Sequence, residues 1–153
     1  MLIGVISDTH GLLRPEAIEA LRGVEQILHA GDIEDPYTLE QLSELAPVTA
    51  VRGNCDTGEL RALPLSVAVE WAGVRIFMLH IQEDLDLDPA TAGFQVVIVG
   101  HTHQPRMEER QGVLYLNPGS AGPRRFKLPV SLARLRLEQG RAEAEIVQLF
   151  KPL

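Results

Sequence analysis

Five short apolar runs, rich in Val and Ile, constrain the fold of this chain more than any other feature of its sequence. The runs cover residues 2–6, 26–28, 48–51, 74–79 and 95–99. Near-continuous apolar runs of this length are typical of strands that are buried on both faces of a sheet. The sequence therefore predicts a layered fold whose central strands are covered on both sides.

Helical segments separate the first three runs. Pro15 opens one helix over residues 16–22, and Gly23 ends it. Asp35 is placed to act as the N-cap of a second helix that starts at Pro36 and extends to about residue 45. Because strands and helices alternate here, we expect parallel βαβ units with right-handed crossovers.

Hairpin signals dominate the second half of the chain instead. Turn residues stand between paired apolar segments at Ala72-Gly73, at Gln111-Gly112 and at residues 139–141. No repeat, low-complexity tract or long linker divides the sequence. We therefore expect one mixed α/β domain over residues 1–153, built of two packed sheets.

Composition excludes several classes of protein. A chain of 153 residues can bury a sizeable core, and its single cysteine, Cys55, cannot form an internal disulfide, which excludes a disulfide-built secreted module. No apolar run approaches the ~18 residues of a membrane helix. The net charge of −7 argues against non-specific nucleic-acid binding. The first residues have no basic flank, so we expect a cytoplasmic protein without a signal peptide.

Side chains able to bind a metal ion follow each of the five apolar runs. They are Asp8, His10, Asp32, Asn54, His80, His101 and His103. Open α/β sheets bind their ligands at the carboxyl ends of strands, so these side chains are expected to meet. Glycine precedes Asp32, Asn54 and His101, where it permits a tight exit from the strand.

Seven nitrogen and oxygen ligands are too many for one tetrahedral site and suit two adjacent ions. The mixture of imidazole with carboxylate favours Mn, Fe, Zn, Co or Ni over Ca. In a two-metal centre one carboxylate usually bridges the ions, and a bridging hydroxide acts as the nucleophile. We expect Asp32 to be that bridge. The reaction that such a centre suits is hydrolysis of a phosphate ester.

The motifs resemble those of the calcineurin-like metallophosphoesterase superfamily. They read Asp8-Thr9-His10, Gly31-Asp32, Gly53-Asn54-Cys55-Asp56, His80 and Gly100-His101-Thr102-His103. Asn117-Pro118-Gly119-Ser120 is also similar to the small bacterial and archaeal YfcE-like branch. The resemblance implies a four-layer α/β/β/α sandwich and phosphodiesterase activity with Mn²⁺ or a similar ion.

The same resemblance implies a division of the ligands between two ions. One ion would be held by Asp8, His10, Asp32 and His103, and the other by Asp32, Asn54, His80 and His101. Asn54 would also orient the phosphate.

Two positions depart from the family pattern. Many members carry His where this chain has Cys55, and a thiol with a pKa of ~8.5 is a weaker proton donor to a leaving group. Cys55 is therefore a candidate catalytic residue or, alternatively, a small buried filler beside the site. Gln82 replaces a His that is frequent in the small branch, and this change affects substrate contacts rather than the metal ligands.

Other polar residues near the motifs are weaker candidates for binding substrate or metal. Arg14 follows the first motif closely and is the best candidate for binding substrate phosphate. His29 is expected to pack locally. The acidic residues Asp84, Asp86 and Asp88 do not fit a calcium loop, since Pro89 and Gln95 occupy positions where Gly and Glu are needed, and Asp88-Pro89 instead predicts a helix start.

The sequence thus favours a phosphodiesterase acting on a small or nucleotide-like phosphodiester. Its expected cofactors are two divalent ions, Mn²⁺ first, with Zn²⁺, Fe, Ni²⁺ or Co²⁺ as alternatives. The runner-up is a non-catalytic scaffold or binding module of the same fold, as in the retromer subunit Vps29. No membrane partner is expected, and association into a homo-oligomer is left open.

Overall fold

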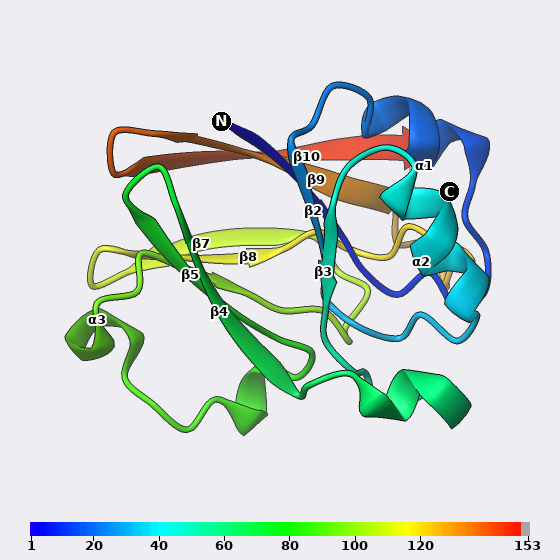
Figure 1. The fold of residues 1–153 in the computed structure, drawn as a ribbon, viewed down its shortest axis with the longest axis horizontal. Coiled ribbons are helices and arrows are strands. Elements are labelled where there is room, and N and C mark those ends of the chain that lie inside the picture. Colours follow the sequence, from blue (N-terminus) through cyan, green and yellow to red (C-terminus); the bar gives the residue numbers. More distant parts are fainter. Residues whose placement is uncertain (151–153) are drawn as a thin grey trace.

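Two five-stranded sheets form the body of the molecule in the computed structural model, which describes residues 1–150 (Figure 1). The first sheet contains β1 (Leu2–Ile6), β2 (Gln26–His29), β3 (Val48–Ala50), β9 (Val130–Glu138) and β10 (Arg141–Phe150). The second contains β4 (Ser66–Trp71), β5 (Val74–Leu79), β6 (Val96–Ile98), β7 (Arg106–Arg110) and β8 (Val113–Asn117). The predicted mixed α/β architecture with two mixed sheets is confirmed.

Parallel and antiparallel pairs are distributed as the sequence predicts. The first sheet has the order β10-β9-β1-β2-β3, in which β1, β2 and β3 are parallel. The second has the order β4-β5-β6-β8-β7. The three predicted hairpins are β4–β5, β7–β8 and β9–β10. Positive φ angles at Ala72 and Gly73, +51° and +76°, explain the tight turn between β4 and β5.

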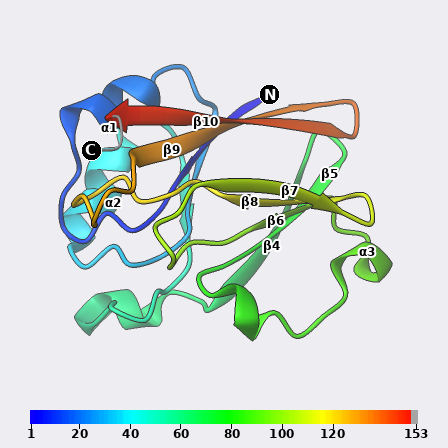
Figure 2. The same ribbon diagram turned by 180° about the vertical axis from the view of Figure 1, so that it is seen from behind.

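Helices α1 (Pro15–Ala20) and α2 (Pro36–Ser43) cover the outer face of the first sheet (Figures 1 and 2). They bury a cluster that includes Ile6, Leu21 and Ile27. The side chain of Asp35 accepts a hydrogen bond from the Tyr37 backbone N–H at 3.0 Å, which confirms the predicted N-cap. Both helices end about two residues earlier than the sequence predicts.

The layer on the outer face of the second sheet is thin. It consists of loops, the 3-10 turn η2 (Gln82–Asp84) and the one-turn helix α3 (Pro89–Ala92). Arg75 of β5 donates to the Ala92 carbonyl at 2.6 Å, and Phe94 packs edge-on against Phe77 with ring centroids 5.3 Å apart. These contacts tie the predicted Asp88-Pro89 helix start to the sheet.

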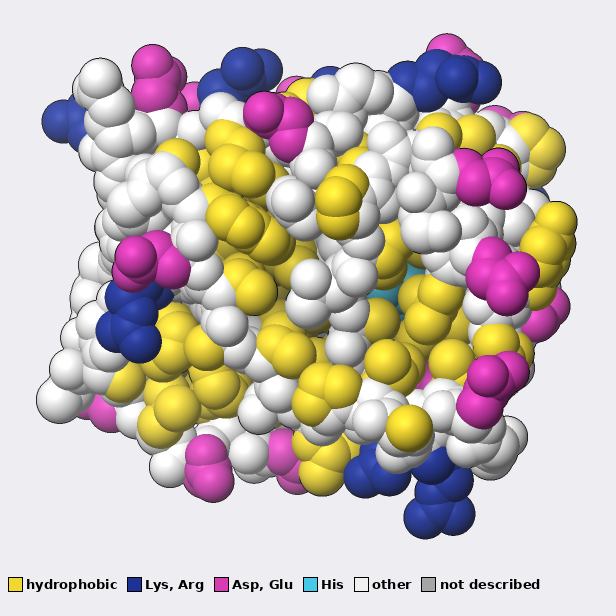
Figure 3. Space-filling view, in the orientation of Figure 1, with side chains coloured by type: hydrophobic (Ala, Val, Ile, Leu, Met, Phe, Trp, Pro, Cys, Tyr) yellow, Lys and Arg dark blue, Asp and Glu magenta, His cyan; other side chains and the backbone are white. Residues whose placement is uncertain are grey.

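The main core lies between the two sheets, where side chains such as Ile3, Leu28 and Ile76 are fully buried. Edge strands β3 and β4 lie in front in Figure 1, and β10 and β7 lie in front in Figure 2. In the space-filling view, hydrophobic side chains occupy the middle of the front face and charged side chains gather along its rim (Figure 3).

The helices in the described part of the chain are too short or too polar to span a membrane. The cytoplasmic location stays a prediction.

The topology brings five strand ends to one region. The carboxyl ends of β1, β2 and β3 come from the first sheet, and those of β5 and β6 come from the second. Backbone hydrogen bonds continue between the segments beyond these strands, from Asp8 N–H to the Gly31 carbonyl at 3.0 Å and from Gly100 N–H to the His80 carbonyl at 2.9 Å. The fold therefore holds the segments that carry the predicted ligands against one another.

Candidate metal centre

The seven predicted ligand residues converge between the carboxyl ends of the two sheets. Six of their side chains fall into two groups whose potential ligand atoms lie within 4.8 Å of one another. The first group is Asp8, His10 and His103, and the second is Asp32, His80 and His101. Asn54 joins the second group, because its Oδ1 lies 3.1 Å from His101 Nδ1.

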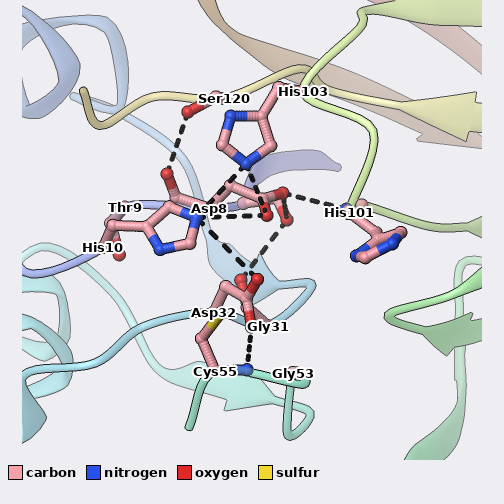
Figure 4. Close-up of polar contacts among 12 residues, drawn as sticks. Asp8, Thr9, His10, Gly31, Asp32, Gly53, Cys55, His101, His103 and Ser120 are labelled. Atoms are coloured by element: carbon pink, nitrogen blue, oxygen red, sulfur yellow. Dashed lines mark hydrogen bonds and ion pairs between the residues drawn. The ribbon is translucent and has the colours of Figure 1, made fainter. Parts of the chain in front are cut away.

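Ligand atoms in the first group are spaced as in a shared coordination sphere. Asp8 Oδ1 lies 3.3 Å from His103 Nε2 and 3.7 Å from His10 Nε2. Bond lengths of about 2.0–2.2 Å to a divalent ion place neighbouring ligands roughly this far apart. Figure 4 shows the three side chains pointing toward a common centre. The spacing fits an ion held between them.

Asp32 lies between the two groups. Its Oδ2 is 3.1 Å from His80 Nε2, in the second group, and 3.8 Å from His10 Nε2, in the first. Its Oδ1 accepts a hydrogen bond from the Cys55 backbone N–H at 2.8 Å. One carboxylate oxygen is thus held by the protein while the other faces imidazoles of both groups.

Asp8 is arranged in the same way. Its Oδ2 accepts hydrogen bonds from the Ser7 hydroxyl at 2.6 Å and from the His101 backbone N–H at 3.1 Å. Its Oδ1 is buried and has no hydrogen-bond partner among the described residues, and the same holds for Nε2 of His80. Buried polar atoms without partners are costly and rare. Two of them aimed into one cluster fit a site built for cations.

Groups behind the ligands orient two of the imidazoles. Glu34 holds His10 Nδ1 at 2.9 Å, and the Ala30 carbonyl holds His80 Nδ1 at 2.7 Å. In both rings Nε2 therefore faces the centre. Such outer contacts fix the orientation of metal-binding histidines and raise their basicity as ligands.

Charge in the cluster shifts the pKa values in opposite directions for acids and bases. The carboxylate of Asp8 raises the pKa of His10 to about 9, with a further contribution from Glu34. Burial alone would raise the pKa of Asp8, but the nearby imidazoles of His10 and His103, together with the hydrogen bond from Ser7, hold it well below its usual range. The raised pKa of His10 favours its protonated form, whose positive charge balances the carboxylates where divalent ions would otherwise do so.

The backbone at the site is strained. Positive φ angles occur at Asp8, His10, Asp32, Glu34, His101 and His103. Left-handed conformations of residues other than glycine are uncommon and cluster at functional sites. Five of the seven predicted ligands have such a conformation. The surrounding structure therefore holds these side chains in place although the backbone conformation is unfavourable.

Two glycines allow the loops to approach closely. A Cβ atom on Gly53 would collide with the backbone N and the carboxylate of Asp32, and one on Gly100 would collide with the Ser7 hydroxyl and lie 2.9 Å from Asp8 Oδ2. Two of the three glycines predicted to permit a tight exit from a strand are therefore required by the atoms beside them.

Asp56 holds two of the loops together. Its carboxylate accepts hydrogen bonds from the backbone N–H groups of Asp32, Ile33, Glu34 and Gly53, at 3.1, 2.8, 2.9 and 2.8 Å. The sequence places Asp56 in the third motif but does not indicate this role. Glu34 also escapes prediction, because no pattern in the sequence links it to His10.

Predicted residues at the rim have different surroundings. Cys55 is exposed, so its interpretation as a buried filler is wrong. Its thiol lies near His10 and Asp32, and partial desolvation, together with the Asp32 carboxylate, raises its pKa. Arg14 donates from Nε to the Gly122 carbonyl at 3.0 Å, and its guanidinium lies 5.0 Å from the ring centroid of Phe150. These contacts give Arg14 a structural role, and its binding of substrate stays a prediction. His29 packs locally as expected, with Nε2 3.0 Å from the Thr9 hydroxyl.

Comparison with known proteins assigns the chain to a family. The calcineurin-like phosphoesterase superfamily domain matches residues 1–140. The chain belongs to this superfamily. A "Probable metallophosphoesterase" of Methanothermobacter thermautotrophicus is 39% identical over 165 residues, covering 100% of this chain and 95% of the relative. Phosphodiesterase YfcE of Escherichia coli K12 is 35% identical over 157 residues, covering 84% of each.

Two solved structures have the same fold. A structure described as a novel archaeal phosphodiesterase matches with a TM-score of 0.80 and 28% identity, over 96% of this chain and 100% of the other. Vps29 of Chaetomium thermophilum matches with a TM-score of 0.78 and 24% identity, over 99% of this chain and 100% of the other. The likeness to Vps29 concerns the fold alone. The predicted family resemblance is confirmed.

Proposed function

We propose that this chain is a phosphodiesterase that uses two divalent metal ions, with Mn²⁺ as the preferred metal, to hydrolyse a small phosphodiester. One ion is held by Asp8, His10, Asp32 and His103, and the other by Asp32, Asn54, His80 and His101. The observation that carries the proposal is the position of Asp32 Oδ2 between His80 Nε2, at 3.1 Å, and His10 Nε2, at 3.8 Å.

The donor set agrees with the proposed metals. Histidine nitrogens together with carboxylate and amide oxygens suit Mn²⁺, Fe, Zn²⁺, Co²⁺ or Ni²⁺. When bound, a pair of such ions neutralises phosphoryl oxygens and lowers the pKa of water toward neutrality. The protein's part is to keep the ligands in place, and the hydrogen bonds behind His10, His80 and Asp32 do this before any ion arrives.

Residues at the open side of the cluster have separate roles in the proposed reaction. Asn54 is exposed, and its Nδ2 can donate a hydrogen bond to a phosphoryl oxygen. The Cys55 thiol remains protonated at neutral pH because its pKa is raised, so it can donate a proton to the leaving group. As a thiol it is a poor donor for unactivated esters, and this disfavours a phosphomonoesterase.

Two further observations support catalysis over a scaffold function. All seven ligand residues are present and brought together, whereas a scaffold has no need to retain a strained cluster of this kind. Relatives at 35–39% identity carry the names phosphodiesterase and metallophosphoesterase. A Vps29-like binding module is the outcome that failure of the following experiment would favour.

The experiment compares hydrolysis of bis(p-nitrophenyl) phosphate with that of p-nitrophenyl phosphate, each with and without Mn²⁺. The proposal predicts turnover that depends on Mn²⁺ and a clear preference for the diester. A preference for the monoester would make the chain a phosphomonoesterase. Inert protein that nevertheless binds a protein partner would support the scaffold.

A further inference from the structure

A cleft of about 730 Å³ opens directly beside the candidate metal centre. Asn54 and His80 form one end of it. From there it extends between the 3-10 turn η1 (Gly58–Ala62) and the loop that follows β5. Its volume lies within the range of pockets that bind small organic ligands. A phosphoryl group at the metal centre would therefore direct one of its ester substituents into this cleft.

One part of the cleft is apolar. Leu65, Phe77, Leu79 and Ile81 line it. Leu65 is 63% exposed, an unusual position for leucine unless something covers it. Phe77 is held by its edge-on contact with Phe94, so its ring offers a fixed surface to a ligand. This part of the cleft suits a flat, weakly polar group.

The polar residues of the cleft are divided by charge. Arg52 and Arg61 come from the η1 side, and Arg52 is anchored by a hydrogen bond from Nη1 to the Arg61 carbonyl at 3.2 Å. Asp84 and Asp86 come from the loop after β5. Along the lower edge of Figure 3, basic and hydrophobic side chains lie next to one another where Figure 1 places the turn before β4. Arg52 directly precedes Gly53-Asn54 in the sequence, and it lines the same cleft as Asn54 and His80.

We propose that this cleft binds the nucleoside of a nucleotide diester, an inference that rests on the proposed phosphodiesterase function. The base lies against Leu65 and Phe77, and sugar hydroxyls or base amino groups donate to Asp84 and Asp86. Arg52 assists with phosphate charge. A glycerol or small alkyl ester would leave the apolar wall uncovered, and a lipid chain would bring hydrocarbon against two carboxylates, at a cost in desolvation.

The test is isothermal titration of the Mn²⁺-loaded protein with adenosine 5′-monophosphate and with ribose 5-phosphate, which differ only in the base. We expect the first to bind about tenfold more tightly, as a contact of one base with an aromatic side chain provides. Leu65→Ser should reduce this preference, because it removes the apolar side chain proposed to cover the base together with Phe77. Met107→Ser is the matched control, since Met107 is 49% exposed on β7 and outside the cleft.

Equal binding of the two ligands would overturn the proposal, as would equal effects of Leu65→Ser and Met107→Ser. A second variant, Asp84→Asn combined with Asp86→Asn, should weaken both ligands if the carboxylates bind sugar hydroxyls. Hydrolysis of bis(p-nitrophenyl) phosphate is measured in parallel. Turnover of the diester without a preference for the base would support the phosphodiesterase function and contradict the proposed nucleoside-binding cleft. A preference for the base without turnover would support the cleft and contradict the phosphodiesterase function.

Discussion

His80 Nε2 and Asp32 Oδ2 face each other at 3.1 Å, and each side chain is fixed from behind by a backbone group. The Ala30 carbonyl holds His80, and the Cys55 N–H holds Asp32. Although burial opposes it, the carboxylate raises the pKa of His80, while His80 lowers the pKa of Asp32. The two candidate ligands are thus held at a distance that fits a shared ion.

Glu34 should contribute to metal affinity without touching the metal. Glu34→Gln removes the negative charge beside His10 Nδ1, and losses of outer ligand contacts typically lower metal affinity by about 10–100-fold. Calorimetric titration with Mn²⁺ should show weaker binding at one of two sites. Glu40→Gln, on the exposed side of α2, is the control and should bind as wild type. Equal weakening at both sites would contradict the assignment of His10 to one ion.

Asp56 should stabilise the fold and the site together. Asp56→Asn leaves at least two of the four backbone donors without an acceptor, at a cost of about 1–3 kcal/mol each. Chemical denaturation of the metal-free protein should therefore show a loss of roughly 2–6 kcal/mol. Asp35→Asn is the control, because asparagine caps helices as well as aspartate does. A loss no larger than that of the control would show that the four contacts contribute little.

The metal-free protein should lose stability as pH rises. The pKa of His10 is raised from 6.5 to about 9, so its contribution is fully present below pH 6.5 and disappears as pH rises through 9. Denaturation measured between pH 6 and 10 should show this decline, and His10→Gln should reduce it. Affinity for Mn²⁺ should change in the opposite direction, increasing by up to about tenfold per pH unit for each proton displaced. Stability that is flat or rising with pH in the metal-free protein would contradict the charge balance described for the cluster.

Cys55→His should extend the reaction to poorer leaving groups. An imidazole is a stronger general acid near neutral pH than a thiol, and positioned proton donors contribute about 10²–10⁴-fold. The measurement is kcat for a series of aryl and alkyl diesters with leaving groups of increasing pKa. We expect a shallower dependence for Cys55→His and a steeper one for Cys55→Ser, because a serine hydroxyl is a much weaker acid than a thiol. If all three proteins gave the same slope, Cys55 would not donate the proton.

The local pattern of the sequence predicts much of this arrangement. Each of the five apolar runs forms a strand, and a candidate ligand residue follows each of these strands. The sequence predicts this because the hydrophobic pattern of a strand is a local property of the chain. The sequence does not reveal that three of these strands lie in one sheet and two in the other. That division depends on pairings such as β1 with β9, in which Ile3 meets Leu135.

Roles that depend on distant partners also escape prediction. Arg14 follows the first motif closely, yet its side chain bonds to Gly122, 108 residues away. His10 is oriented by Glu34, and Asp32 by the backbone of Cys55, across loops that only the tertiary fold brings together. The helix α1 ends at Ala20 because its last turn tightens before Gly23, whose φ is +84°.

The most direct test of the metal centre is the metal content of protein purified without chelators and saturated with Mn²⁺, measured by inductively coupled plasma mass spectrometry. We expect close to two ions per chain, a higher melting temperature than that of the metal-free protein, and one ion or fewer in Asp32→Asn. A wild-type content well below one ion, with no shift in melting temperature, would contradict the proposed metal centre.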